Sequence, residues 1–371
     1  MTSLFVWQRD VFCCYVPFLC CALLRGNYFV NISNSSITAF LQCRQLHHYR
    51  YDLNLEPLKP NFDLLLGKAI HYALERWYGH GEDPLVAYRD TFQAQHMEIL
   101  TSYTFSEDES VELLALWNLG FDMLSHYIDV YKSQASVFSF VLSEFEFCVP
   151  IPDTDGFFEG RIDGIIEDEG GDLWIIEHKT AKSFPDPSYF DFMTQPLQYL
   201  WAMQQVIDSD IIENIPAGTP LRGWCYNGLR KAVPKQPKLL KNEREVSIAA
   251  IDSTYEVYLN TLQEYGFDPT DERYRDTLSS LQQQGNTFFS RQWWLCTKYE
   301  LRMIEEELQA IYEEMSRVDK QWYRTPTPFT CPRCPFLEPC QAEQKGSDAE
   351  YLIANFYRTR KTDIALDPVV G

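Results

Sequence analysis

The chain has 371 residues and a formal net charge of −21, and 45% of its residues are hydrophobic and 15% aromatic. This composition is that of a folded globular protein and excludes an intrinsically disordered one. The acidic balance argues against a protein that coats nucleic acid non-specifically, but it is compatible with an enzyme that has a local basic groove and bound cations.

The first notable segment is an apolar run of 14 residues from Val11 to Leu24. A membrane-spanning helix needs about 20 apolar residues. A signal peptide carries basic residues before its apolar stretch, but only Arg9 precedes this run and Asp10 offsets its charge. We therefore expect residues 1–32 to be an N-terminal extension of undefined role and expect no membrane association. A membrane or secretory segment, or an extension foreign to the folded domain, remains an alternative.

From Ser33 onward, helical and extended patterns follow one another. Helices are predicted at 36–49, 64–78 and 111–131 from apolar residues at helical spacing. Strands rich in β-branched and aromatic residues are predicted at 138–148, 157–166 and 173–177, with a hairpin turn at 168–172. Later come a helix at 188–206, a strand at 221–226, helices at 251–265 and 299–318, and an irregular loop at 325–340. This order predicts an α/β fold with a central sheet flanked by helices.

Two carboxylates and a lysine stand out in the strand region, with thirteen residues between Asp163 and Glu177, and Lys179 two residues further on. Residues two apart in a strand share a face, and antiparallel pairing across the turn brings Asp163 beside them. Burying these charges is costly unless a cation such as Mg²⁺ compensates. A metal and a lysine are what phosphodiester hydrolysis needs. Because a Glu-x-Lys triplet also occurs by chance, an ordinary surface hairpin is the alternative.

These residues resemble motifs II and III of the RecB-like branch of the PD-(D/E)XK nucleases, with Ile162 in place of the proline before the aspartate. Gly67-Lys-Ala-Ile-His71 resembles the helical motif that gives this branch an extra metal-ligating histidine. Gln195-x-x-x-Tyr199 resembles the branch's QxxxY motif, and helical spacing puts both side chains on one face. The resemblance covers about residues 33–341 and implies a restriction-endonuclease-like central mixed sheet flanked by helices.

The resemblance also implies roles for individual residues. It makes Asp163, Glu177 and Lys179 catalytic, and it assigns Mg²⁺ or Mn²⁺ to His71, Asp163, Glu177 and the backbone carbonyl of His178. It implies that Gln195 and Tyr199 contact DNA. Without the resemblance, His71 is an ordinary core histidine, and Gln195 and Tyr199 form a polar helix face. Glu144 or Glu146, on the preceding strand, is a further candidate ligand.

Of the eleven cysteines, Cys331, Cys334 and Cys340 lie close together near the C-terminus. In a reducing compartment such spacing is typical of a metal site, which needs a fourth ligand. The spacing leaves zinc, a [4Fe–4S] cluster and a loop without function open. Cluster-bearing RecB-like nucleases, including CRISPR-adaptation and phage enzymes, take one cysteine from before the histidine motif. The resemblance therefore implies Cys43 as the fourth ligand of a structural [4Fe–4S] cluster that closes additional helices.

The segment 222–244 reverses the acidic character of the chain, because it holds seven basic residues and one acidic residue. Such a segment after the core sheet could lead a DNA strand toward the metals. We predict that Arg230 and Lys231 bind DNA. A solvated basic loop is the alternative.

These observations predict a nuclease domain at 33–345 and a C-terminal tail at 346–371. The predicted function is a metal-dependent DNA exonuclease acting on single strands or DNA ends, in recombination, repair or phage DNA processing. It would work in the cytoplasm of a bacterial cell or phage-infected host, with recombination or repair proteins as partners. The alternatives are a non-catalytic iron–sulfur DNA-binding or assembly subunit and an iron–sulfur redox protein.

Overall fold

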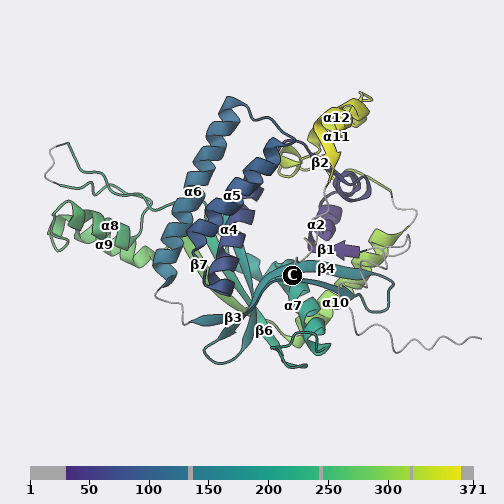
Figure 1. The fold of residues 1–371 in the computed structure, drawn as a ribbon, viewed down its shortest axis with the longest axis horizontal. Coiled ribbons are helices and arrows are strands. Elements are labelled where there is room, and N and C mark those ends of the chain that lie inside the picture. Colours follow the sequence, from purple (N-terminus) through teal and green to yellow (C-terminus); the bar gives the residue numbers. More distant parts are fainter. Residues whose placement is uncertain (1–30, 133–136, 242–244, 318–320, 361–371) are drawn as a thin grey trace, which may run out of the picture.

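A mixed β-sheet forms the centre of the structure, and helices cover both of its faces (Figure 1). The computed structural model describes residues 31–132, 137–241, 245–317 and 321–360. The strands follow the order β3-β4-β5-β6-β7, and β1 runs parallel to the start of β4. Their bounds are β1(Asn31–Ser33), β3(Phe138–Pro150), β4(Phe157–Asp168), β5(Leu173–Ala181), β6(Leu221–Arg230) and β7(Phe289–Leu295).

The middle of the sheet is a hairpin followed by a crossover. β4 and β5 are antiparallel and are joined by a turn in which the Asp168 carboxylate accepts the backbone N–H groups of Gly170 and Asp172. Gly171 has φ 82° there, which a glycine adopts without strain. β5 leads through η3(Pro187–Phe192) and α7(Thr194–Asp208) to β6, which is parallel to β5. The predicted hairpin turn and central sheet are thus confirmed.

Two hydrophobic layers sandwich the sheet. On one face, α4(Phe62–His80), α5(Pro84–Leu100) and α6(Glu107–Tyr131) pack around buried residues such as Leu66, Tyr88 and Leu124. On the other, α7 and α10(Lys298–Ser316) bury residues such as Trp201 and Leu308 against the strands. The sheet is therefore buried on both sides, as its largely apolar strands require.

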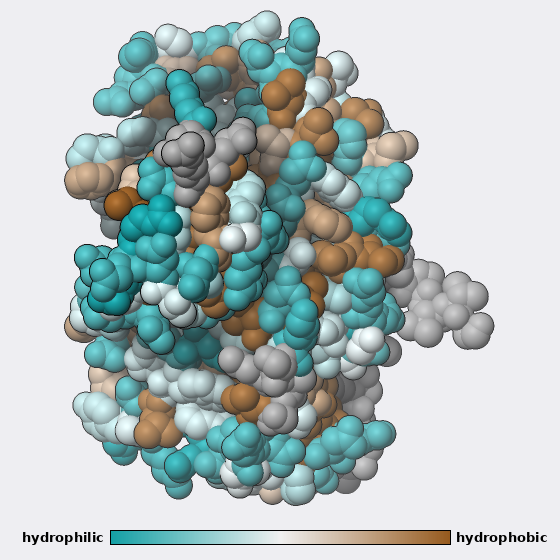
Figure 2. Space-filling view, turned by 90° about the vertical axis from the view of Figure 1, so that its left-hand side faces the viewer, coloured by the Kyte–Doolittle hydropathy of each residue, from teal (hydrophilic) through white to brown (hydrophobic). Residues whose placement is uncertain are grey.

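An arm projects from the sheet between β6 and β7 (Figure 1). It contains α8(Tyr255–Glu264) and α9(Glu272–Gln284), and buries a small core of its own that includes Val246, Tyr258 and Tyr274. The side of the molecule that carries the arm is mainly hydrophilic, with hydrophobic residues in scattered groups (Figure 2). Its own core makes the arm a distinct unit inserted between two neighbouring strands.

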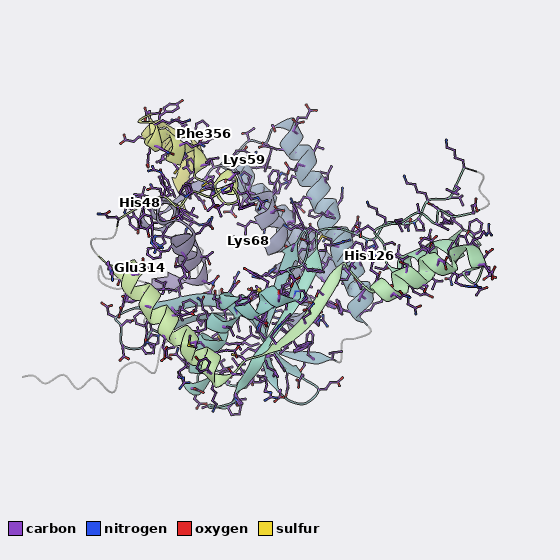
Figure 3. The ribbon with its side chains drawn as sticks, turned by 180° about the vertical axis from the view of Figure 1, so that it is seen from behind. His48, Lys59, Lys68, His126, Glu314 and Phe356 are labelled. Carbon is purple, nitrogen blue, oxygen red and sulfur yellow. The ribbon has the colours of Figure 1, made fainter. Side chains whose placement is uncertain are left out.

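The two ends of the described chain meet in a separate lobe. The N-terminal part consists of α2(Asn34–Gln42), α3(Arg44–His47), the π-helical turn η1(His48–Asp52) and β2(Leu55–Pro57). The C-terminal part consists of η4(Cys331–Arg333), α11(Leu337–Gln344), α12(Ala349–Phe356) and β8(Tyr357–Thr359), and β8 pairs with β2. His48 and Phe356 accordingly lie in the same region of the molecule (Figure 3). Residues 346–360, expected to belong to a C-terminal tail, thus continue the fold, whereas residues 361–371 lie outside the described part.

Several local predictions were wrong. The helix predicted at 36–49 breaks at Cys43, whose backbone is extended with φ −165° and ψ 120°. Part of the loop predicted at 325–340 belongs to α11. The sequence analysis did not predict α5, α9 or β7. The sequence of α9 is largely polar, and its few apolar residues become a buried face only against α8 and the rest of the arm.

The N-terminal extension lies outside the described residues, apart from residues 31 and 32 in β1. Within the described ranges, no helix is both long and apolar enough to cross a membrane.

Gly120 of α6 allows a close approach of helices, and we predict that Gly120→Ala destabilises the protein. A Cβ atom at this position would come within 2.5 Å of Leu66 Cδ1 and would overlap the Tyr88 hydroxyl. We expect a loss of about 1–3 kcal/mol in the free energy of unfolding, measured by urea denaturation. Gly67→Ala is the matched control, since its Cβ would meet only Thr180 Oγ1 at 3.6 Å. An equal loss in both variants would contradict this explanation.

Candidate active site

The register of three neighbouring strands sets three carboxylates side by side. Ser143 of β3 and Ile176 of β5 both pair with Gly164 of β4, so Glu144, Asp163 and Glu177 stand one position further along. The β4–β5 pairing ends at Gly164. Beyond it, the Asp163 carboxylate accepts the backbone N–H of His178 through Oδ2 at 2.6 Å. The aspartate is thus fixed where the two strands begin to separate.

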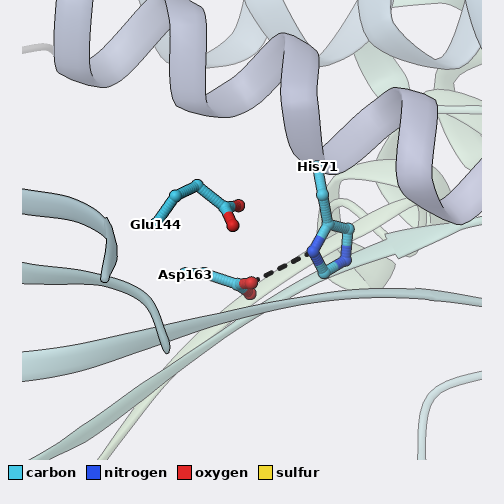
Figure 4. A group of neighbouring side chains, drawn as sticks. All are labelled: His71, Glu144 and Asp163. Atoms are coloured by element: carbon cyan, nitrogen blue, oxygen red, sulfur yellow. Dashed lines mark hydrogen bonds and ion pairs between the residues drawn. The ribbon is translucent and has the colours of Figure 1, made fainter. Parts of the chain in front are cut away.

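His71 reaches this point from α4 (Figure 4). Its Nδ1 lies 3.1 Å from Asp163 Oδ1. Burial opposes the charged forms of both groups, but their mutual attraction lowers the pKa of Asp163 and raises that of His71. The neighbouring His178 is different, because burial lowers the pKa of its ring to about 3 and keeps it neutral.

Glu144 completes a group of three side chains around this point. The ligand atoms of His71, Glu144 and Asp163 all lie within 4.8 Å of one another. Glu144 has φ 47°, an unusual backbone conformation for a residue other than glycine. Burial and the nearby Asp163 raise its pKa to about 7, although Arg161 lies 2.9 Å away and opposes the rise. Glu146, the other candidate on β3, does not belong to this group.

Lys179 faces Glu177 and α7. Its Nζ lies 2.5 Å from Glu177 Oε1 and donates to Gln195 Oε1 at 3.1 Å. Gln195 Nε2 in turn donates to the Tyr199 hydroxyl at 3.2 Å. Burial opposes the charge on Lys179, but Glu177 holds its pKa above the ordinary value. A protonated lysine is therefore held beside the carboxylates by two elements that are far apart in sequence.

The donor set fits a divalent cation. Carboxylate oxygens with one imidazole suit Mg²⁺ or Mn²⁺. Burial is the main cost of ionising Glu144, and the like charge of Asp163 on the opposed strand position adds to that cost, so the pKa of Glu144 is raised. A cation held by His71, Glu144 and Asp163 would relieve it.

Comparison with known families agrees with this arrangement. The sequence profile of the PD-(D/E)XK nuclease superfamily matches residues 31–341. The chain belongs to this superfamily. Its members are nucleases that use Mg²⁺ or Mn²⁺, and the mixed sheet with helices on both faces is consistent with their fold. No curated protein sequence matches the chain significantly.

Two other predicted residues of this PD-(D/E)XK protein lie in ion pairs at the base of the arm. Arg230 contacts Asp252 at 2.5 Å and its guanidinium lies over the Phe288 ring, 4.0 Å from the centroid. Lys231 contacts Asp63 of α4 at 2.6 Å. Both side chains are more than four-fifths buried, so each has a structural partner where the arm joins the nuclease core.

The four cysteines of the sequence prediction come together in the lobe. Cys43, Cys334 and Cys340 pack against a core formed by Ala39, Leu46, Tyr49 and Phe336. Burial raises the pKa of the Cys334 thiol, and the charges of Cys340, Cys43 and Cys331 add to the effect. The Arg324 Nε–H donates to Cys340 Sγ at 3.1 Å, and the Thr325 N–H donates to Cys43 Sγ at 3.5 Å.

We predict that Glu144→Gln stabilises the metal-free protein at high pH. Because the pKa of Glu144 rises from 4.5 in the unfolded chain to about 7, ionisation destabilises the fold as pH increases between these values. The glutamine variant has no such charge. In the presence of a chelator, the free energy of unfolding of the glutamine variant should exceed that of the wild type. The difference should grow to about 1–3 kcal/mol between about pH 5 and pH 8, after allowance for the lost Arg161 contact. A constant difference across this range would contradict the prediction.

Proposed function

We propose that the protein is a metal-dependent DNA exonuclease of the RecB-like branch, acting on single strands or DNA ends. The observation that carries the proposal is the group of His71, Asp163, Glu177 and Lys179, which converge from α4, β4 and β5. Their order along the chain and the Gln195–Tyr199 pair support the RecB-like assignment. The proposed processes are recombination, repair or phage DNA processing, with proteins of these pathways as partners.

The proposed roles combine the resemblance to the RecB-like branch with the group of His71, Glu144 and Asp163. His71, Asp163, Glu177 and the backbone carbonyl of His178 would hold Mg²⁺ or Mn²⁺, and Glu144 is an added ligand. When bound, the cation would supply Lewis-acid polarisation of the scissile phosphate. The chain itself keeps Asp163 ionised through His71 and the His178 N–H. It also keeps Lys179 protonated beside Glu177, where the ammonium can orient an attacking water and offset charge developing on the phosphate.

Several side chains beyond the carboxylates are proposed DNA contacts. Gln195 accepts from Lys179 and donates to the Tyr199 hydroxyl, so this pair lies beside the proposed catalytic lysine. Arg230 and Lys231 remain proposed DNA contacts, but their ion pairs with Asp252 and Asp63 leave little positive charge for a DNA phosphate. Lys235 and Lys238 follow on the arm; they are exposed and make no ion pair with the described residues. We therefore extend the proposed phosphate contact to these two lysines.

We also propose that Cys43, Cys331, Cys334 and Cys340 hold a [4Fe–4S] cluster. The lobe joins the N-terminal and C-terminal cysteines, and N–H groups donate to two of the sulfurs, as is common around such clusters. Among the described residues, three ligand atoms lie within 4.8 Å of one another only at His71, Glu144 and Asp163. The cysteine sulfurs are therefore spread more widely than four thiolates about 2.3 Å from one zinc ion would be. Zinc stays the alternative.

The nuclease proposal predicts that Lys179→Ala abolishes digestion of DNA. The assay uses Mn²⁺ or Mg²⁺ and single- and double-stranded DNA substrates labelled at either end. We expect the rate of DNA digestion to fall on the order of 100-fold or more, since the lysine offsets charge in the transition state. Lys298→Ala, an exposed lysine on α10, is the matched control and should digest like the wild type.

The same assay reports strand preference and polarity, and a chelator should stop it. Equal digestion by the wild type and Lys179→Ala would refute the active site. A wild type that binds DNA but cleaves no substrate would instead favour the non-catalytic DNA-binding subunit.

The cluster proposal predicts that protein purified without oxygen contains about four iron atoms per chain and absorbs visible light. Cys334→Ala should lose the colour and lower the thermal unfolding midpoint, because the cluster links the two halves of the lobe. Cys296→Ala, a half-buried thiol outside the lobe, is the control and should stay coloured. A colourless protein that contains zinc would overturn the cluster and leave the nuclease proposal intact.

A further inference from the structure

A row of buried polar side chains crosses three strands beneath the site. Arg291 of β7 pairs in register with Asn227 of β6, and Asn227 pairs in register with His178 of β5. His178 and Asn227 are almost fully buried, and Arg291 is largely buried. Such groups are costly to bury unless their hydrogen bonds are satisfied. The row ends at the residue between Glu177 and Lys179.

Asn227 is the link in this row. Its Oδ1 accepts from the Tyr127 hydroxyl at 3.0 Å and lies 3.4 Å from the Arg291 Nε. With the oxygen used in this way, its Nδ2 faces His178 Nδ1 at 2.7 Å and donates to it. The amide therefore joins the arginine end of the row to the imidazole, and it cannot rotate without losing both contacts.

Arg291 is itself held on several sides. Its Nη2 donates to the Tyr78 hydroxyl at 3.0 Å and to the Tyr127 hydroxyl at 2.9 Å. Its guanidinium lies over the Tyr131 ring, 3.9 Å from the centroid. Tyr78 stands seven residues after His71 on α4, which places both on one face of that helix. The row is therefore tied to the helix that presents His71, as well as to α6.

His178 connects the row to the candidate metal ligands. Its backbone N–H donates to Asp163 Oδ2 at 2.6 Å. Its ring lies edge-on to that of His71, with centroids 5.8 Å apart. Rotation of the His178 ring would thus disturb the His71 ring, whose Nδ1 contacts Asp163.

We propose that Asn227 is a positioning residue for the metal site. Its hydrogen bond fixes the His178 ring, and that ring packs against His71, which contacts Asp163. The His71 ring is thereby held in the orientation that binds the cation. This inference rests on the proposed function. The competing explanation is that the row only stabilises the fold, and the two explanations predict different behaviour of matched variants.

The test compares Asn227→Leu with Tyr127→Phe. Asn227→Leu removes the hydrogen bond to His178. Tyr127→Phe removes equally buried hydrogen bonds, to Asn227 and Arg291, and leaves the Asn227–His178 bond intact. Calorimetric titration of Mn²⁺ without DNA measures the site independently of activity. We expect Asn227→Leu to weaken Mn²⁺ binding about 10–100-fold and to lower kcat with little change in the KM for DNA. Tyr127→Phe should bind Mn²⁺ like the wild type.

Asn227→Asp provides a rescue, because its carboxylate can accept a hydrogen bond from a His178 ring protonated at Nδ1. It should bind Mn²⁺ within a few-fold of the wild type. If Asn227→Leu does not unfold cooperatively, Asn227→Ser takes its place with the same expected result.

Wild-type Mn²⁺ affinity in a folded Asn227→Leu (or Asn227→Ser) variant, or an equal loss in Tyr127→Phe, would overturn the inference. A wild-type protein that itself fails to bind Mn²⁺ would instead refute the metal site in the proposed function.

Discussion

The hydrogen bond from the His178 backbone N–H to Asp163 is the interaction on which the site depends. It forms where β4 and β5 stop pairing, so a backbone donor that would otherwise serve the sheet is available to a carboxylate. Three acidic side chains on adjacent strands would repel one another at this edge without such donors and without His71 and Lys179. The sheet provides the position, and the histidine and lysine on its two sides provide the compensating charge.

The two layers of helices contribute different things to this edge. α4 presents His71 and, two turns later, Tyr78, so the helix links the candidate ligand to the buried row beneath the sheet. α7 presents Gln195 and Tyr199 to Lys179 from the other side. Successive side chains of β5 point to opposite faces of the sheet. Glu177 and Lys179 therefore face the layer of α7, whereas His178 faces the layer of α4 and α6.

The sequence predicted the part of this arrangement that is local. Asp163, Glu177 and Lys179 lie on one hairpin, and the turn residues and strand patterns are strong enough to imply their proximity. His71, Gln195 and Tyr199 needed the resemblance, because helical periodicity does not say which strand a helix covers. The row through Asn227 and Arg291 could not be predicted from the sequence, because predicting it requires the register of three strands, and β7 was not predicted. The breaking of the first helix at Cys43 was also invisible, because nothing in its local pattern marks the end of the helix.

The lobe has a consequence for the order in which the molecule is made. Its two halves come from residues 34–57 and 331–359, and β2 lacks its partner until β8 exists. During synthesis from the N-terminus, the sheet and its two helix layers can therefore assemble before Cys331, Cys334 and Cys340 are available to join Cys43. Of the described parts, the lobe is the last to be completed, when β8 pairs with β2.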